Sequence, residues 1–203
     1  MFNMDYSKIK IPYIQNNIVK KAAERFRKKY GNNKIPVDME NIIEIQLGIN
    51  IIPVPNLEKL CNTDALISSD WKNIYVDERS FLDERYLKRY RFSLAHEMGH
   101  YVLHKNIYNL FEIKDFKGYY RYNDQLPKKE HQRIEFQADL FASHLLIPRN
   151  KLILEKNKIL KKNKKDLKNI DRKLINQYIS NPLSKIFGVS PRALTVVLDH
   201  LEK

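Results

Sequence analysis

The sequence predicts an α+β fold with a helical core, a small β-sheet of about three strands and a C-terminal helix-turn-helix-like segment. Apolar residues recur at helical spacing in several long segments, which predicts amphipathic helices that pack against one another. Short runs rich in β-branched residues fall between residues 49 and 76 and predict the strands. A glycine turn at Gly188 separates two short apolar segments near the C-terminus.

Length and composition indicate a globular protein. The 203 residues and the hydrophobic content of 43% suffice for one compact domain with an appendage. No apolar run reaches the length of a membrane span, and residues 1–13 lack the apolar segment of a secretory signal, so we expect a cytoplasmic protein that does not engage a membrane. The single cysteine, Cys61, cannot form an intramolecular disulfide, and we interpret it as a reduced structural thiol.

The chain is strongly basic, with a formal net charge of +13. The charge is concentrated in residues 20–29 and 156–173. Such clusters suit nucleic acid or an acidic protein partner. A solvated lysine-rich face that reflects the overall Lys, Asn and Ile content is the alternative interpretation.

The N-terminal part is predicted to contain two helices. Apolar residues at four-residue intervals indicate an amphipathic helix over residues 14–30, whose apolar face we expect to comprise Ile14, Ile18, Ala22, Phe26 and Tyr30. The run Gly31-Asn32-Asn33 ends this helix. A shorter helix is expected over residues 38–47, closed by Gly48.

Three strands are predicted next. Residues 49–54 are rich in β-branched side chains, and Pro53 places this strand at a sheet edge or makes it end there. Residues 65–68 and 73–76 are expected to pair as a hairpin. The turn between them is polar apart from Trp71, which we interpret as a turn aromatic rather than a site residue.

Two long helices should form the centre of the chain. One is expected over residues 81–105, preceded by a capping signal at residues 80–83, and the other over residues 127–147, ended by Pro148. Residues 106–125 are rich in Tyr and Phe and show no clear period, so we expect a long loop that can include one short helix. This segment either lines a substrate cleft or is an irregular packed connection.

The first of these helices contains His96-Glu97-Met98-Gly99-His100, an HExxH signature of zinc hydrolases. On an α-helix, His96 and His100 project from one face about one turn apart and can bind one Zn²⁺. Glu97 then lies beside the metal, where it can polarise a water molecule. The alternative is a surface helix with two incidental histidines, but apolar residues at helical spacing around the motif favour a helix that faces a core.

A catalytic zinc site needs a third protein ligand. His104 lies about 12 Å along the helix axis from His96, at about 1.5 Å per residue, which is too far for both to bind one ion. The second helix offers Glu135, with Asp139 one turn further along the same face. Glu135 would complete a gluzincin-like His₂Glu site, and Asp139 could accept the free ring N–H of a ligating histidine. An ordinary solvated acidic face is the alternative.

Other polar side chains near these ligands are weaker candidates. His131 lies four residues before Glu135 on the same face and is either a supporting or substrate-contacting group or a surface histidine. His144 projects nearly opposite Glu135 and is expected to be structural or exposed. Candidates for a second electrophile, none of which we assign, are Tyr119, Tyr120, Arg121, Tyr122 and His131.

Residues 35–148 closely resemble the ImmA/IrrE-type metallopeptidases. The resemblance is carried by residues 35–38, 47–49, 52–55, 74–76, 91–104 and 135–148, including a Glu-x-x-Ala-x-x-Phe-Ala stretch that begins at Glu135. It implies a zincin-like domain in which His96, His100 and Glu135 bind Zn²⁺ and Glu97 is catalytic. Two features depart from the family pattern. Gln137 stands where an acidic residue is common, which should not affect metal binding, and the segment from residue 105 to 130 is long and aromatic, which leaves the substrate open.

The C-terminal segment reads as helix, turn and helix over residues 183–194. Gly188 lies at the turn, Ser190 is the expected N-cap and Pro191 the first helical residue. Only Arg192 and Thr195 are obvious contacts for bases or phosphates, so DNA contact and a structural or protein-docking role both stay open. We therefore divide the chain into residues 1–150, the zincin-like metallopeptidase domain, and 151–203, a basic helical linker, expected to be peripheral, with the helix-turn-helix-like module.

These observations predict an intracellular zinc endopeptidase with Glu97 as general base. The resemblance implies a protein substrate, most simply a transcriptional repressor. One rival is a nucleic-acid-binding regulator with a structural or sensory metal site, suggested by the positive charge and the C-terminal helices. Another is a toxin or effector that applies the same chemistry to a host protein.

Overall fold

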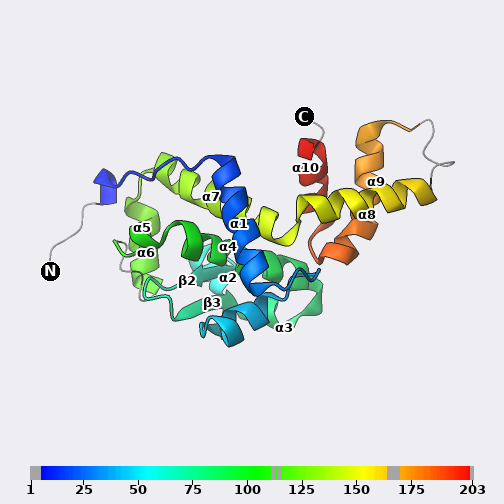
Figure 1. Ribbon diagram of the computed structural model, residues 1–203. Helices are drawn as coiled ribbons and strands as arrows, with labels where there is room; N and C mark the ends of the chain where they lie inside the picture. The colour runs from blue at the N-terminus through cyan, green and yellow to red at the C-terminus, as the bar shows by residue number, and fades with distance from the viewer. Residues whose placement is uncertain (1–5, 111–112, 114–115, 164–169, 202–203) are drawn as a thin grey trace.

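The computed structural model describes residues 6–110, 113, 116–163 and 170–201. It is mostly helical with one small sheet, so the α+β class is confirmed. Helices α1 to α7 and the sheet form one body, and α8 runs outward from it, with α9 and α10 at the same end of the molecule (Figure 1). None of the helices in the described ranges combines the length and apolarity needed to cross a membrane.

Helix α1 (Asn16–Tyr30) confirms the predicted N-terminal helix and ends at Gly31, whose N–H donates to the Arg27 carbonyl at 2.8 Å. Its apolar face was predicted wrongly in part. Val19, Ala23 and Phe26 are buried, whereas Ile18 is 48% exposed. Successive residues at four-residue spacing drift by about 40° around a helix of 3.6 residues per turn, so the buried stripe cannot follow that spacing for four turns.

The second predicted helix is a short one. After two helical residues, Asn41–Gln46 forms a wide turn of π type, with Ile42 and Ile43 buried. It leads into Gly48, which has a positive φ of 65°.

The three predicted strands form one mixed sheet in the order β1-β3-β2. Strand β1 (Asn50–Val54) pairs in parallel with β3 (Asn73–Asp77), and β2 (Ala65–Ile67) pairs antiparallel with β3, as expected for a hairpin. Pro53 lies in the edge strand β1, where a missing N–H is tolerated. Helix α2 (Leu57–Cys61) connects β1 to β2. Trp71, in the hairpin turn, packs on the rings of Tyr101 and Tyr108.

The helix that carries the HExxH motif begins later than predicted. Residues 78–103 form α3 (Glu78–Leu82), a 3₁₀ turn (Glu84–Tyr86) and α4 (Leu87–Leu103) rather than one helix from residue 81. Asp83 interrupts the helix because its backbone is extended and its side chain accepts the Arg85 N–H at 3.0 Å. Short acidic side chains that bond the neighbouring backbone compete with helix formation in this way.

Helices α4 and α7 (Lys128–Leu146) form the core pair of the fold. The predicted stripe of α7 is confirmed, since Ile134, Ala138, Phe141 and Leu145 are completely buried. Gly99 of α4 meets the backbone of Ala138: a Cβ at Gly99 would lie 2.9 Å from the Ala138 Cα. A glycine at this crossing therefore lets the two helices approach closely.

The expected long loop between these helices is largely helical. It contains α5 (Lys105–Tyr108) and α6 (Phe116–Gln125), while residues 111–112 and 114–115 lie outside the described part of the chain. The burial of the tyrosines follows a helical period that the sequence does not make obvious. Tyr122 is buried and Tyr119 is half-buried, whereas Tyr120 between them is 48% exposed. A tyrosine-rich segment thus packs its rings onto the core from one helical face.

The C-terminal part consists of α8 (Arg149–Lys162), α9 (Arg172–Phe187) and α10 (Pro191–Leu201). The predicted turn is confirmed: Gly188 has φ 64°, and the Ser190 hydroxyl accepts the Ala193 N–H at 3.2 Å. Residues 164–169 of the predicted basic segment lie outside the described residues. On α4, Arg91 donates to the Gly188 carbonyl at 2.9 Å and ties this turn to the metal-motif helix. The domain division at residue 150 stays a prediction.

Candidate metal centre

Helix α4 brings the HExxH side chains together as its spacing predicts. His96 Nε2 and His100 Nε2 lie 3.0 Å apart. The potential ligand atoms of His96, Glu97 and His100 all lie within 4.8 Å of one another. This cluster can hold a metal ion.

Glu135 on α7 lies opposite the two histidines. Its Oε2 is 3.1 Å from His96 Nε2, and its Oε1 is 3.7 Å from His100 Nε2. A tetrahedral zinc ion with bonds of about 2.0–2.1 Å holds its ligand atoms about 3.3–3.4 Å apart. The three observed separations bracket this value, so the residues present fit a His₂Glu zinc site with one coordination position left over.

Asp139 lies one turn beyond Glu135 and contacts the other side of His96. Its Oδ1 is 2.8 Å from His96 Nδ1. A carboxylate at this distance accepts the Nδ1–H and leaves the lone pair of the ring on Nε2, the nitrogen that faces Glu135. The Asp139 side chain is 58% exposed, so this support lies at the open side of the site.

Glu97 is buried beside the two histidines, and its Oε2 accepts the backbone N–H of Ile67 at 2.8 Å. The edge strand β2 therefore holds this carboxylate in place. Burial raises the pKa of Glu97 to about 7, opposed by the charge of His96 and assisted by that of Glu135. A carboxyl group with a pKa near neutrality can both accept and release a proton at cellular pH.

The carboxyl of Glu135 has the opposite character. Burial by itself raises its pKa, but the neighbouring rings of His100 and His96 outweigh burial and lower the pKa to about 2. Glu135 therefore presents a carboxylate to the two histidine nitrogens, which is the state in which it can bind a metal.

Two side chains that the sequence did not assign to the site lie directly behind it. His104 Nδ1 is 3.1 Å from His100 Nδ1, and His104 Nε2 is 2.8 Å from Oε1 of Gln137. His104 is completely buried, and burial lowers its pKa to about 4. His104 therefore contacts the Nδ1 side of His100 and not the ligand atoms of His96 and Glu135. Its four-residue spacing from His100 was the signal that could have indicated this contact.

An aromatic wall from α5 and α6 covers the inner side of the site. The Tyr108 ring lies 5.0 Å from that of His100, and Tyr122 packs on Tyr108 and on His131. Burial raises the pKa of Tyr119 to about 12, with Glu135 and Glu97 among the nearby charges. Of the candidates for a second electrophile, Tyr119, Tyr122 and His131 therefore lie on the side of the candidate metal centre, whereas Tyr120 and Arg121 are exposed. His131 contacts Asn123 Oδ1 at 2.9 Å.

A family model described as an IrrE N-terminal-like domain, Peptidase_M78, matches residues 74–198, more than half of the chain. The chain belongs to the M78 peptidase family. The matched segment begins in β3, includes α4, α7, α8 and α9, and ends within α10. Ile67, which holds Glu97, precedes it.

A transcriptional regulator from Mycobacterium tuberculosis has a similar fold, with a TM-score of 0.55 and 18% sequence identity. The alignment covers 90% of this chain and 56% of the regulator, so the chain spans little more than half of the regulator's length. At this identity the similarity concerns the fold alone. No curated protein matches the chain.

Proposed function

We propose that this M78 peptidase is an intracellular zinc-dependent endopeptidase that cleaves a regulatory protein. The observation that carries the proposal is the triangle formed by His96 Nε2, His100 Nε2 and the Glu135 carboxylate, with separations of 3.0, 3.1 and 3.7 Å. Glu97 beside it supplies a buried carboxyl group that is not needed as a ligand. A reducing compartment agrees with the single buried thiol, Cys61.

Each side chain at the metal centre has a separate role in peptide-bond hydrolysis. Zn²⁺ held by His96, His100 and Glu135 would supply Lewis acidity, which lowers the pKa of a water molecule and polarises the scissile carbonyl. Glu97 takes the proton of the attacking water and passes it to the leaving amine. Because Ile67 N–H occupies Oε2, we assign this transfer to Oε1. Asp139 keeps the His96 ring oriented during the reaction.

We infer that the substrate is a protein, most simply a transcriptional repressor. The resemblance of residues 35–148 to ImmA/IrrE-type peptidases and membership of the M78 family support a regulator as the target.

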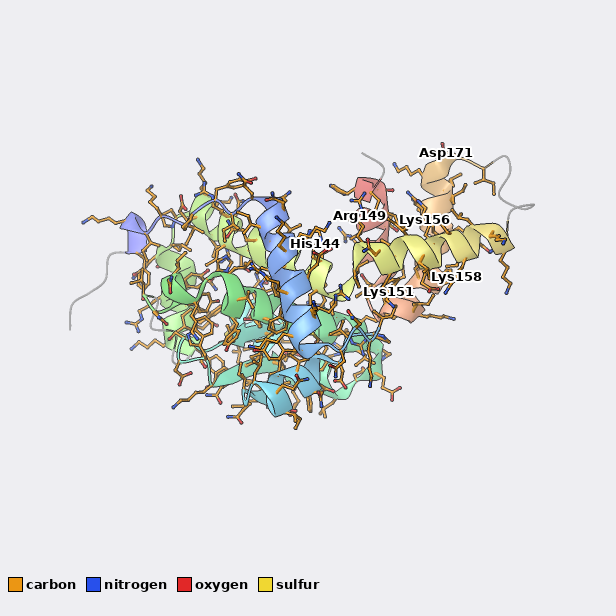
Figure 2. All side chains as sticks on the ribbon, in the orientation of Figure 1. His144, Arg149, Lys151, Lys156, Lys158 and Asp171 are labelled. Atoms are coloured by element: carbon orange, nitrogen blue, oxygen red, sulfur yellow. The ribbon has the colours of Figure 1, made fainter. Side chains whose placement is uncertain are left out.

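A second candidate function is nucleic-acid binding by a regulator with a structural or sensory metal site. Its support is a hollow of about 230 Å³ between α1 and the start of α8, lined by Arg27, Arg149 and Lys151 together with Glu24. Figure 2 shows Arg149, Lys151, Lys156 and Lys158 distributed along α8. Phosphate contacts of such side chains would give binding that weakens steeply as salt rises.

The variant Glu97→Gln separates the two functions. It removes the proton acceptor but leaves His96, His100 and Glu135 unchanged, so we expect full zinc content, unchanged nucleic-acid affinity and no cleavage. The assay is mass spectrometry of cellular proteins after expression of the native chain and, in parallel, of the variant. A fragment seen only with the native chain identifies the substrate and tells whether it is a repressor or a host protein. Identical fragments and rates in both samples would refute the mechanism.

The variant Glu135→Ala tests the ligand assignment with zinc stoichiometry as the readout. Removal of one of three protein ligands should abolish tight 1:1 binding. Full retention of tightly bound zinc would contradict Glu135 as the third ligand.

A further inference from the structure

An unbroken chain of hydrogen bonds leads from His100 to the N-terminal segment. His100 Nδ1 lies 3.1 Å from His104 Nδ1, and His104 Nε2 lies 2.8 Å from Gln137 Oε1. Gln137 Nε2 then donates to the backbone carbonyl of Pro12 at 2.9 Å. His100, His104 and Gln137 are all at least 98% buried, so water has little access to the polar groups that form these hydrogen bonds.

The Pro12 carbonyl, at the end of this series of hydrogen bonds, determines where each proton in the series lies. A carbonyl oxygen can only accept, so Gln137 must direct its NH₂ group toward Pro12 and its oxygen toward His104. His104 must then carry its proton on Nε2, which leaves Nδ1 of this neutral ring as an acceptor. His100 donates its Nδ1–H to that acceptor, and the lone pair of His100 lies on Nε2. This is the nitrogen that faces Glu135 and His96 in the triangle.

Helix α7 itself holds the N-terminal segment at the required place. Buried Glu130 accepts the Ile11 N–H at 2.7 Å, and Arg133 donates to the Ile11 carbonyl at 2.7 Å. Arg133 also pairs with Glu130 at 3.0 Å. Residues 130, 133 and 137 follow one another at helical spacing, so one face of α7 binds both Ile11 and Pro12.

We infer that His104 and Gln137 are positioning residues that set the tautomer of His100, with the Pro12 carbonyl as their anchor. This inference rests on the proposed function, because it takes His100 as a metal ligand. The two histidines of the site are thus supported differently: His96 by the carboxylate of Asp139, and His100 by a neutral relay of three groups. A carboxylate at position 137 could not donate to Pro12, which gives a reason for glutamine where the family commonly has an acidic residue.

The first test compares zinc affinities, measured by competition with a chromophoric chelator. His104→Leu removes the acceptor and should weaken zinc binding by about 10- to 100-fold, the usual effect of losing such a partner. His104→Asn keeps an oxygen near the position of Nδ1 and should restore most of that affinity. His144→Leu is the matched control, because His144 is a partly buried histidine near the end of α7 beside α8 (Figure 2) and should bind zinc as the native chain does.

The second test observes the tautomers directly in the zinc-loaded protein by long-range ¹H–¹⁵N NMR of the histidine rings. We expect the proton on Nε2 of His104 and on Nδ1 of His100. A proton on Nδ1 of His104 would overturn the relay. Equal losses in His104→Leu and His104→Asn would assign the effect to packing and overturn it as well, as would native affinity in His104→Leu. Failure of the native chain to bind zinc would instead refute the proposed function, and the relay with it.

Discussion

The close approach of α4 and α7 at Gly99 leads to a prediction that connects the fold to the metal centre. In Gly99→Ala, the new Cβ would lie 2.9 Å from Ala138 Cα and 3.0 Å from its carbonyl oxygen. Contacts between carbon atoms are optimal at about 3.5–4.0 Å, so the helices must separate locally by about 0.6 Å or more. Both opposing atoms belong to the backbone and cannot rotate away.

The effect on stability should be modest. Overpacking of this kind costs about 1–3 kcal/mol, and alanine recovers about 0.5–1 kcal/mol over glycine inside a helix. The net loss of about 0–2.5 kcal/mol lowers the melting temperature by at most about 10 °C for a chain of this size.

Zinc binding should also weaken, by a free energy comparable with this loss of stability. The 3.1 and 3.7 Å separations connect α4 to α7 and lengthen when the helices move apart, whereas the 3.0 Å between His96 and His100 lies within α4 and does not. Metal–ligand distances tolerate deviations of only about 0.2 Å. We therefore expect zinc affinity to fall by at least about tenfold, as for the loss of a supporting contact.

The assay is a zinc titration against a chelator, together with a thermal melt. The double variant Gly99→Ala/Ala138→Gly serves as a control and should recover little, because the two closest atoms stay in place. Native zinc affinity in Gly99→Ala would refute the reasoning that the helix crossing sets the geometry of the ligands.

Two further predictions concern single contacts. Asp139→Ala removes the acceptor of the His96 Nδ1–H. Because the Asp139 side chain is 58% exposed and screened by solvent, we expect zinc affinity to fall by only about tenfold, the lower limit for the loss of such a partner. A larger loss than in His104→Leu would contradict the expectation that the buried partner matters more than the exposed one. Gly188→Ala should lower the melting temperature more than Gly48→Ala does. Both glycines have a positive φ near 65°, which costs about 1–2 kcal/mol for alanine, but only at Gly188 would the new Cβ collide with Arg91. Equal melting temperatures of the two variants would show that the C-terminal turn does not depend on its contact with α4.

Local sequence patterns were sufficient wherever the deciding interactions are short in range. The four-residue spacing placed His96 and His100 on one face of a helix, and the polar turn before Asn73 indicated the hairpin. Gly188, Ser190 and Pro191 predicted the C-terminal turn because helix ends are determined by their own backbone groups and caps. The helical spacing of Glu135 and Asp139 also indicated a third ligand, and the resemblance to ImmA/IrrE-type peptidases added the family.

Elsewhere, tertiary packing decided. Asp83 interrupts the helix before the metal motif through a side-chain bond that competes with helical spacing, and the tyrosines of α6 become a helix by packing on the core.

In the metal centre, too, some features follow from the local sequence and others from tertiary packing. Its residue types and the spacing on each helix follow from the sequence, but the approach of Glu135 to His96 depends on the crossing at Gly99, and the support of His100 depends on a contact between Gln137 and Pro12, 125 positions apart. A helical period specifies which side chains share a face. Only the packing of helices and of the N-terminal segment determines what that face meets.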